Sequence, residues 1–289
     1  MKTLKRLRIS SDLHYGASIE GDAAVRAFAR MAISQGTPQE ALLLGGDLAA
    51  TEDDLHQVLA LLREYPGIKA AIPGNHDIWV PPGSTETSWD RYRKATRIFR
   101  EHGFHPLTDT PLILGDFGIA GALGWYDYGF RDGIGIPVEA YQQKTYHDSR
   151  SGMIHQWADS QYARWSMSDR QVTELELTRL EDHLRCLAHL PEVLVLTHHV
   201  PTKKLLVHPR FIVPRHWRFL NAFLGSERFA ELIRRFPNVR NVVSGHIHRS
   251  ATARIGDIKF TAIGSGRQFR ESITITEGRI SRNRHLGTF

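Results

Sequence analysis

The sequence predicts an α/β protein in which buried strands alternate with amphipathic helices and short antiparallel strands close the chain. Three observations support this prediction. Five apolar, often β-branched runs each lead into a short polar motif. Segments with helical spacing of apolar residues separate most of these runs. After residue 248 the pattern changes to short strand-like stretches joined by turn residues.

The five apolar runs predict strands, because continuous runs of this length suit strands that are covered on both faces. They lie at residues 7–9, 42–44, 70–72, 193–196 and 242–243. The motifs that follow them are Asp12-Leu13-His14, Gly46-Asp47, Gly74-Asn75-His76-Asp77, Thr197-His198-His199 and Gly245-His246-Ile247-His248. We therefore expect these polar side chains at the carboxyl ends of strands, where an open α/β sheet presents its chemistry.

Helical periodicity predicts helices between the runs. The predicted segments are about 16 residues from Glu20, then 53–64, 89–102, 169–189 and 219–236. Strand-like stretches at 251–255, 258–263 and 272–276 follow, with turn signals at Gly256-Asp257 and Glu277-Gly278. A chain of 289 residues that is 41% hydrophobic can bury a full core, and the regular motif spacing predicts a single domain over residues 1–289.

The motifs supply carboxylate, amide and imidazole groups in one order along the chain, and together they predict a two-metal phosphoesterase site. On these motifs the chain resembles the calcineurin-like metallophosphoesterases from Asp12 to His248. The resemblance implies a four-layer α-β-β-α sandwich of two mixed β-sheets flanked by helices. It also implies a pair of metal ions at the carboxyl ends of the strands.

The resemblance assigns the ligands by motif. It implies that Asp12, His14 and His248 bind the first ion, that Asp47 bridges both ions, and that Asn75, His198 and His246 complete the second site. Either of the adjacent His198 and His199 could be the ligand from the residues alone; the family favours His198, which directly follows a Thr. Mixed oxygen and imidazole ligands suit Mn²⁺, Fe, Zn²⁺, Co²⁺ or Ni²⁺ about equally, and we expect Mn²⁺ by a small margin.

The same resemblance implies a mechanism in which a metal-bridging hydroxide attacks phosphorus directly. His76 would face the substrate and protonate the leaving oxygen or stabilise its charge. Relatives of the protein Ser/Thr phosphatases carry a second Asp that orients this histidine, and here Ala50 stands in its place. Asp77 or another carboxylate would have to take that role. The departure argues against a protein phosphatase and favours phosphodiesters or activated phosphates.

Residues 121–168 interrupt the strand and helix alternation and are rich in aromatic and basic side chains, which predicts an insertion that caps the substrate. We expect Trp125, Tyr126, Arg131 and His199 to bind substrate. The alternative is that the insertion packs its aromatic rings into a small core of its own. A basic loop at residues 202–218 would form a wall that attracts anions, or only a solvated surface.

Composition limits the partners. The net charge of +6 fits an anionic small-molecule phosphoester, and the chain shows no dense Lys/Arg tail typical of nucleic-acid binding. The single cysteine, Cys186, excludes an intrachain disulfide. No apolar stretch approaches the roughly 18 residues needed to span a bilayer, so we expect a cytoplasmic protein without a membrane partner. The oligomeric state stays open.

Three functions compete at this point. The preferred one is a metal-dependent phosphodiesterase or phosphatase that acts on a small molecule, such as a nucleotide or cyclic nucleotide. The second is a metal-dependent nuclease with the same chemistry, which would bind DNA in a salt-dependent way. The third is a catalytically silent interaction scaffold; this would normally show eroded ligands, whereas all seven are present here.

Overall fold

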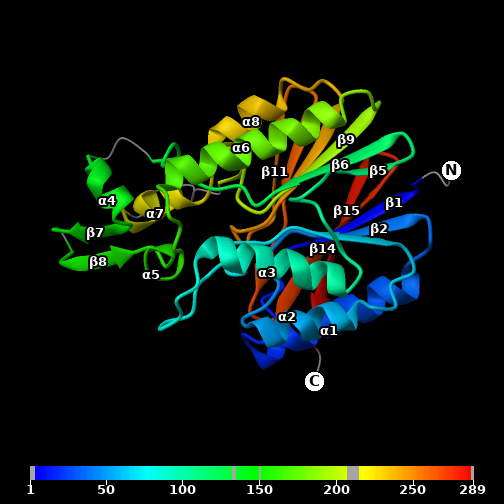
Figure 1. Cartoon of the computed structure of the whole chain (residues 1–289), viewed down its shortest axis with the longest axis horizontal. Coiled ribbons are helices and arrows are strands. Elements are labelled where there is room, and N and C mark those ends of the chain that lie inside the picture. The colour runs from blue at the N-terminus through cyan, green and yellow to red at the C-terminus, as the bar shows by residue number, and fades with distance from the viewer. Residues whose placement is uncertain (1–3, 132–134, 150, 207–214, 288–289) are drawn as a thin grey trace.

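Two mixed β-sheets pack face to face and helices cover both outer faces, as the sequence predicts (Figure 1). The computed structural model describes residues 4–131, 135–149, 151–206 and 215–287. Within these ranges no helix is both long enough and apolar enough to cross a membrane.

The first sheet has seven strands and carries the first three motifs. Its order is β13 (Ser265–Gly266), β14 (Phe269–Thr276), β1 (Arg6–Ser10), β2 (Glu40–Leu44), β3 (Ile68–Ala71) and β4 (His105–Pro106), with β15 (Arg279–Leu286) paired to β14. Strands β1 to β4 run parallel, and β14 is antiparallel to β1. The carboxyl ends of β1, β2 and β3 therefore meet at one edge.

The second sheet has six strands and carries the last two motifs. Its order is β11 (Ala251–Ile255), β12 (Ile258–Ala262), β10 (Val239–Ser244), β9 (Glu192–Thr197), β6 (Phe117–Ala122) and β5 (Leu112–Leu114). Strands β6, β9, β10 and β12 are parallel, whereas β5 and β11 are antiparallel additions at the edges.

Helices α1 (Ile19–Gln35), α2 (Glu52–Leu61) and α3 (Ser88–Glu101) cover the first sheet, and α6 (Asp169–Cys186) and α8 (Glu227–Ile233) cover the second (Figure 1). Local sequence explains where they begin. The side chains of Ser18 and Thr51 cap α1 and α2, and α3 and α6 begin with complete capping boxes, Thr87 with Asp90 and Ser168 with Gln171.

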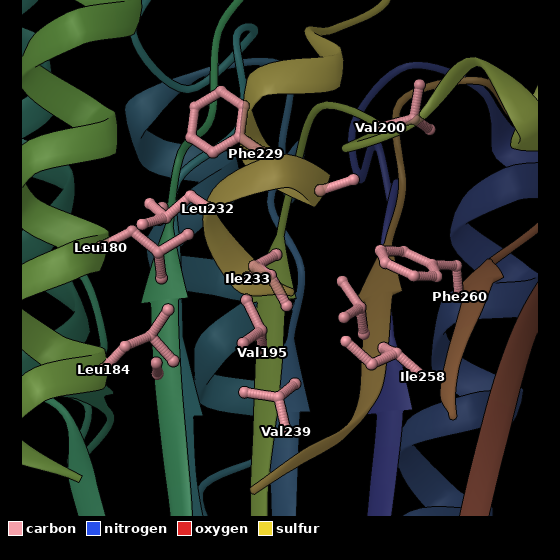
Figure 2. Packing of buried hydrophobic residues seen from close by; sticks show 14 of the residues in the cluster. Leu180, Leu184, Val195, Val200, Phe229, Leu232, Ile233, Val239, Ile258 and Phe260 are labelled. Carbon is pink, nitrogen blue, oxygen red and sulfur yellow. The ribbon is translucent and has the colours of Figure 1, made fainter. Parts of the chain in front are cut away.

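The alternation of side chains along each strand divides the core into layers. In β2, Leu42 and Leu44 pack toward the helices, while Ala41 and Leu43 pack between the sheets. Under α6 and α8, residues such as Leu180, Val195 and Phe260 form a continuous apolar layer (Figure 2). The central strands of both sheets are thus covered on two faces, which is why β2 and β9 carry continuous apolar runs.

The helix predicted at residues 219–236 is wrong as a single element. The structure has α7 (Arg215–Leu220), a short 3₁₀ turn η2 (Asn221–Phe223) and then α8. The break falls at Gly225, which forms an isolated bridge with Val200, and Ser226 then caps α8. This pairing comes from tertiary structure, which overrides the helical spacing of the apolar residues.

A lobe extends from one end of the sandwich (left in Figure 1). It contains α4 (Val138–Gln142), the hairpin β7 (Thr145–Asp148) and β8 (Met153–Gln156), α5 (Asp159–Tyr162), α7 and η2. We call the described residues of 125–162 and 215–223 the lobe. Its aromatic side chains form a buried cluster that includes Trp125, Tyr126, Tyr141 and Phe223. That the predicted insertion at 121–168 caps a substrate remains a proposal.

Candidate metal centre

The loops that follow β1, β2, β3, β9 and β10 bring the seven expected metal ligands together. Two clusters of potential ligand atoms form, one of Asp12, His14, Asp47 and His248, the other of Asp47, His198 and His246; within each, the atoms lie within 4.8 Å of one another. Asp47 belongs to both clusters. This is the grouping that the family resemblance implies, with Asp47 between the two sites.

Asn75 closes the second cluster. Its side-chain oxygen lies 3.1 Å from Nε2 of His198 and 3.1 Å from Nδ1 of His246. The amide nitrogen of Asn75 donates to Asp159 at 3.1 Å, so the oxygen faces the imidazoles. An oxygen and two imidazole nitrogens thus converge beside the Asp47 carboxylate.

The backbone at these loops is held in an unusual conformation. Five of the seven expected ligands have left-handed φ angles: Asp12 (54°), His14 (43°), Asp47 (52°), His246 (68°) and His248 (51°). Such angles cost about 1 kcal/mol or more each for residues other than Gly and persist only where the surroundings impose them. The surrounding structure thus holds these residues in strained backbone conformations that bring the ligand side chains together.

Two motif glycines are required by close approach. A Cβ at Gly74 would lie 2.1 Å from a carboxylate oxygen of Asp47, and a Cβ at Gly245 would lie 2.3 Å from one of Asp12. A side chain at either position would displace a ligand. This gives a physical reason for the Gly in each motif.

The imidazoles are oriented as metal ligands. Nδ1 of His198 donates to the carbonyl of Gly45 at 2.8 Å, and Nε2 lies 3.4 Å from Asp47 Oδ2. Nε2 of His14 and Nε2 of His248 lie only 3.0 Å apart. Nε2 of His246 is buried and makes no hydrogen bond with any residue that the structure describes. Converging lone pairs of this kind fit cations, so the donor set suits two divalent metal ions.

Neighbouring histidines lower the pKa values of the two buried carboxyl groups in the site. Burial raises the pKa of the Asp47 carboxyl, but the facing His198 and His76 outweigh it and hold the pKa well below its usual range. Burial also acts against ionised Asp12, yet the hydrogen bond and charge of His248 lower its pKa to about 2. The imidazoles that face these two buried carboxyl groups therefore favour their ionised form.

Side chains of β13 and β14 donate hydrogen bonds to the loop that carries Asp12 and His14. Ser265 donates its hydroxyl to the carbonyl of Asp12 at 2.8 Å, and the buried Arg270 donates from Nε to the carbonyl of Leu13 at 2.6 Å. These contacts fix the backbone between the expected ligands Asp12 and His14. Nothing in the motif spacing indicates them.

His76 borders the site and is available to a substrate. Its Nε2 lies 3.8 Å from Asp47 Oδ2, its side chain is 35% exposed, and its ring stacks on Trp79 at 3.7 Å between centroids. Asp77 does not orient it. The Asp77 carboxylate accepts the backbone N–H groups of Asp47, Leu48 and Gly74 at 2.8, 3.1 and 2.7 Å. Asp77 thus joins two ligand loops, and the catalytic role expected for it stays a prediction.

The described wall of the cavity beside the ligand clusters includes none of the four residues that the sequence predicts to bind substrate. Trp125 and Tyr126 are fully buried, and their polar atoms are bound to Asp169 (2.8 Å) and Asp159 (3.0 Å). Arg131 is exposed and donates to the carbonyl of Tyr128 at 3.1 Å, away from the residues that line the cavity. The aromatic rings pack on one another, which is the alternative that the sequence left open.

His199 is also buried and belongs to neither ligand cluster. Its ring lies 4.2 Å from that of His246, and its backbone N–H donates to the carbonyl of Leu123. The second cluster thus includes His198, whereas His199 lies behind His246.

A cavity of about 650 Å³ opens beside the ligand clusters and includes Asp47, Asn75, His76, His246 and His248 in its wall. Sequence reasoning missed several of its other residues: Trp79, Trp217 and Arg249. Trp79 and Arg249 lie within three residues of assigned motif histidines, and this proximity could have indicated them.

The basic loop predicted at residues 202–218 contributes only partly to the cavity. Leu206 and Trp217 line the cavity, and Lys203 and Lys204 are exposed. His208 and Arg210 lie outside the described residues.

Asp159 was missed as well, and it joins the lobe to the metal centre. Its buried carboxylate accepts from four donors: Asn75 Nδ2 (3.1 Å), Trp79 Nε1 (2.6 Å), Tyr126 Oη (3.0 Å) and Trp157 Nε1 (2.7 Å). One side chain thus fixes the amide of an expected ligand and two indoles of the cavity wall.

The stacked mixed sheets and the ligand clusters at their strand ends define the class of metal-dependent phosphoesterases. The sequence model of the calcineurin-like phosphoesterase family matches residues 5–250, and the chain belongs to this family. No curated protein sequence is significantly similar to it.

Solved structures share the fold at low sequence identity. A phosphopantetheinyl hydrolase from Mycobacterium tuberculosis is 19% identical with a TM-score of 0.69, and the match covers 92% of each chain. A dimetal phosphatase from Danio rerio is 10% identical with a TM-score of 0.50 over 99% of this chain and 100% of that one. A putative 5′-nucleotidase from Staphylococcus aureus is 12% identical with a TM-score of 0.52 over 98% of this chain and 54% of that one.

Proposed function

We propose that the protein is a binuclear metal-dependent phosphoesterase that hydrolyses a small phosphoester, with phosphodiesters preferred over monoesters. The observation that carries the proposal is the convergence of seven oxygen and imidazole donors into two clusters that share Asp47. The names of the similar structures, a hydrolase, a phosphatase and a nucleotidase, agree with phosphoester hydrolysis, and the preference for diesters rests on the surroundings of His76.

The metal ions and the side chains around them have separate roles in the proposed hydrolysis. Two divalent cations held here would polarise the phosphoryl oxygens and lower the pKa of a water molecule, which then acts as nucleophile. Asp47 would keep the two sites together, and Asp12 and Asn75 would supply oxygen ligands on either side of it. His76, on the cavity wall beside Asp47, is placed to donate a proton to the leaving oxygen.

The surroundings of His76 support the preference for diesters. Its ring stacks on Trp79, and among the described residues the only carboxylate within 4 Å of its nitrogens is Asp47, a predicted metal ligand. Without a separate carboxylate to orient the ring, His76 is less well held for proton donation to a poor leaving group. Phosphodiesters with good leaving groups depend less on that proton.

The test begins with protein stripped by a chelator and reloaded with one metal at a time: Mn²⁺, Fe²⁺, Zn²⁺, Co²⁺ or Ni²⁺. Hydrolysis of p-nitrophenyl monoester and diester, cyclic nucleotides, dinucleotides and oligonucleotides is then measured together with bound metal. We expect diester hydrolysis that requires about two ions per chain. Protein that binds two ions and hydrolyses none of these compounds would contradict the proposal. Oligonucleotides as the best substrates, with salt-dependent binding, would favour the nuclease instead.

A further inference from the structure

Beyond the metal ligands, the cavity is markedly apolar. Its remaining wall consists mainly of Trp79, Trp157, Trp217, Leu206, Leu224 and Ile247. Other than the candidate ligands and His76, the polar side chains that the described wall contributes are those of Asn221 and Arg249. A wall of this composition binds by contact area and offers few hydrogen bonds.

The two inner indoles are held rigidly with their polar atoms turned away from a ligand. The Nε1 atoms of Trp79 and Trp157 both donate to Asp159. Trp79 is sandwiched between His76 and Tyr162, at centroid distances of 3.7 and 4.9 Å. Trp157 stacks on Phe223 at 5.5 Å with the rings 10° from parallel. The wall is therefore preformed and presents carbon surface.

Trp217 and Arg249 are exposed members of the wall. Trp217 is 49% exposed, a large apolar surface to leave in water. The guanidinium of Arg249 makes no ion pair or hydrogen bond with any residue that the structure describes, and it directly follows the expected ligand His248. Its charge suits the phosphate oxygens of a substrate whose organic part lies against the indoles.

Hydrogen-bonding capacity decides between kinds of organic group. A nucleobase or sugar would lose several hydrogen bonds to water in this cavity and find few replacements, which is costly. An alkyl chain or plain aromatic ring loses none and gains from leaving water. The apolar wall of the cavity therefore favours an alkyl chain or a plain aromatic ring.

We propose that this cavity takes an uncharged, apolar ester group of the phosphate that the metal centre hydrolyses, so that the substrate is an alkyl or aryl phosphodiester and not a nucleotide. This inference rests on the proposed function for its reaction. In that reaction water oxygen bonds to phosphorus, one P–O ester bond breaks, and the departing oxygen takes a proton.

The test uses p-nitrophenyl phosphodiesters that share one leaving group and differ in the second ester: methyl, hexyl or thymidine 5′. The hexyl and methyl esters have similar intrinsic reactivity, so their kcat/KM ratio reports the cavity. We expect a ratio of about tenfold or more in favour of hexyl, the effect of burying a few methylene groups. The thymidine ester should not exceed the hexyl ester. A ratio near one, or thymidine as the best substrate, overturns the proposal.

Two variants test whether the preference for the hexyl ester arises from Trp217 in the cavity wall. Trp217→Ala should reduce the hexyl to methyl ratio severalfold, and this exposed position should tolerate the change. Trp165→Ala is the matched control, because Trp165 is a partly buried tryptophan that does not line the cavity. It should keep the wild-type ratio. Equal ratios in wild type and Trp217→Ala would remove Trp217 from the site.

Binding gives a readout that does not depend on turnover. Hexylphosphonate should bind the metal-loaded protein about tenfold more tightly than methylphosphonate in calorimetry. Equal affinities would overturn the inference whatever the enzyme hydrolyses. Tight hexylphosphonate binding without any hydrolysis would contradict the proposed function and leave the cavity assignment standing.

Discussion

The strand-end loops and the lobe both bury polar groups, but they do so in opposite ways. In the loops, carboxylates and imidazoles face one another, and the Nε2 atoms of His14 and His248 approach to 3.0 Å. Beside the lobe, a buried carboxylate is surrounded by donors: Asp169, at the start of α6, accepts from the lobe residues Trp125, Tyr128 and Lys144. Converging acceptors create a demand for cations, whereas satisfied acceptors only hold structure together.

Asp159 belongs to both regions. Like Asp169 it is buried in an aromatic setting, but one of its donors is the amide of Asn75. The comparison therefore predicts that substitutions in the loops change metal binding and turnover, that substitutions in the lobe change stability, and that Asp159 changes both.

Asp47→Asn should have the largest effect, because it removes the charge that both ligand clusters share. We expect loss of most activity and weaker binding at both metal sites, measured by metal analysis after dialysis and by turnover of the best diester. A variant that keeps two ions and wild-type turnover would show that the loops are not a two-metal site.

His76→Ala should lower turnover while both metals stay bound, since His76 faces the cavity and is not an expected ligand. General acid catalysis contributes about 10²- to 10⁴-fold for poor leaving groups and much less for p-nitrophenolate. Comparing alkyl and p-nitrophenyl leaving groups measures the difference. Equal losses for both would assign His76 an electrostatic or structural role.

Asp159→Asn should weaken metal binding or activity by about 10- to 100-fold, the usual cost of removing a partner that orients a ligand. Asp169→Asn is the matched control, because the buried Asp169 accepts from Trp125, Tyr128 and Lys144, and none of these is an expected ligand. It should lower the melting temperature with metal affinity unchanged. If both variants only lower the melting temperature, Asp159 does not orient Asn75.

Trp125→Phe should have the smallest effect on function. The change removes the indole N–H that donates to Asp169 and should cost about 1 to 3 kcal/mol of stability, because a buried acceptor loses a partner. KM for the best diester should stay within about twofold of wild type. A large rise in KM at unchanged stability would restore Trp125 to the substrate site.

Much of the fold was predictable from local pattern. The apolar runs before Asp12, Asp47, Asn75, His198 and His246 are strands in the structure, and most of the helical segments are helices within a few residues of their predicted ends. The predictions failed where one segment meets another: the helix at 219–236 breaks at Gly225 because that residue pairs with Val200. Several short strands, among them β4 and β7, carry too few residues to show a period.

The sequence by itself determined the order of strands and helices and the motifs that carry the family resemblance, because the strand-end motifs combine local periodicity with side chains of specific chemistry. The resemblance in turn implied the four layers and the expected metal ligands. Only the tertiary structure decided which aromatic rings reach the cavity. Trp125 and Trp157 belong to the same aromatic stretch, but one is buried on Asp169 and the other lines the cavity with its N–H on Asp159. Which tryptophan lines the cavity depends on how the lobe packs against the strand-end loops. These contacts join residues that are distant in sequence, so they leave no periodic signal in the amino-acid sequence of either segment.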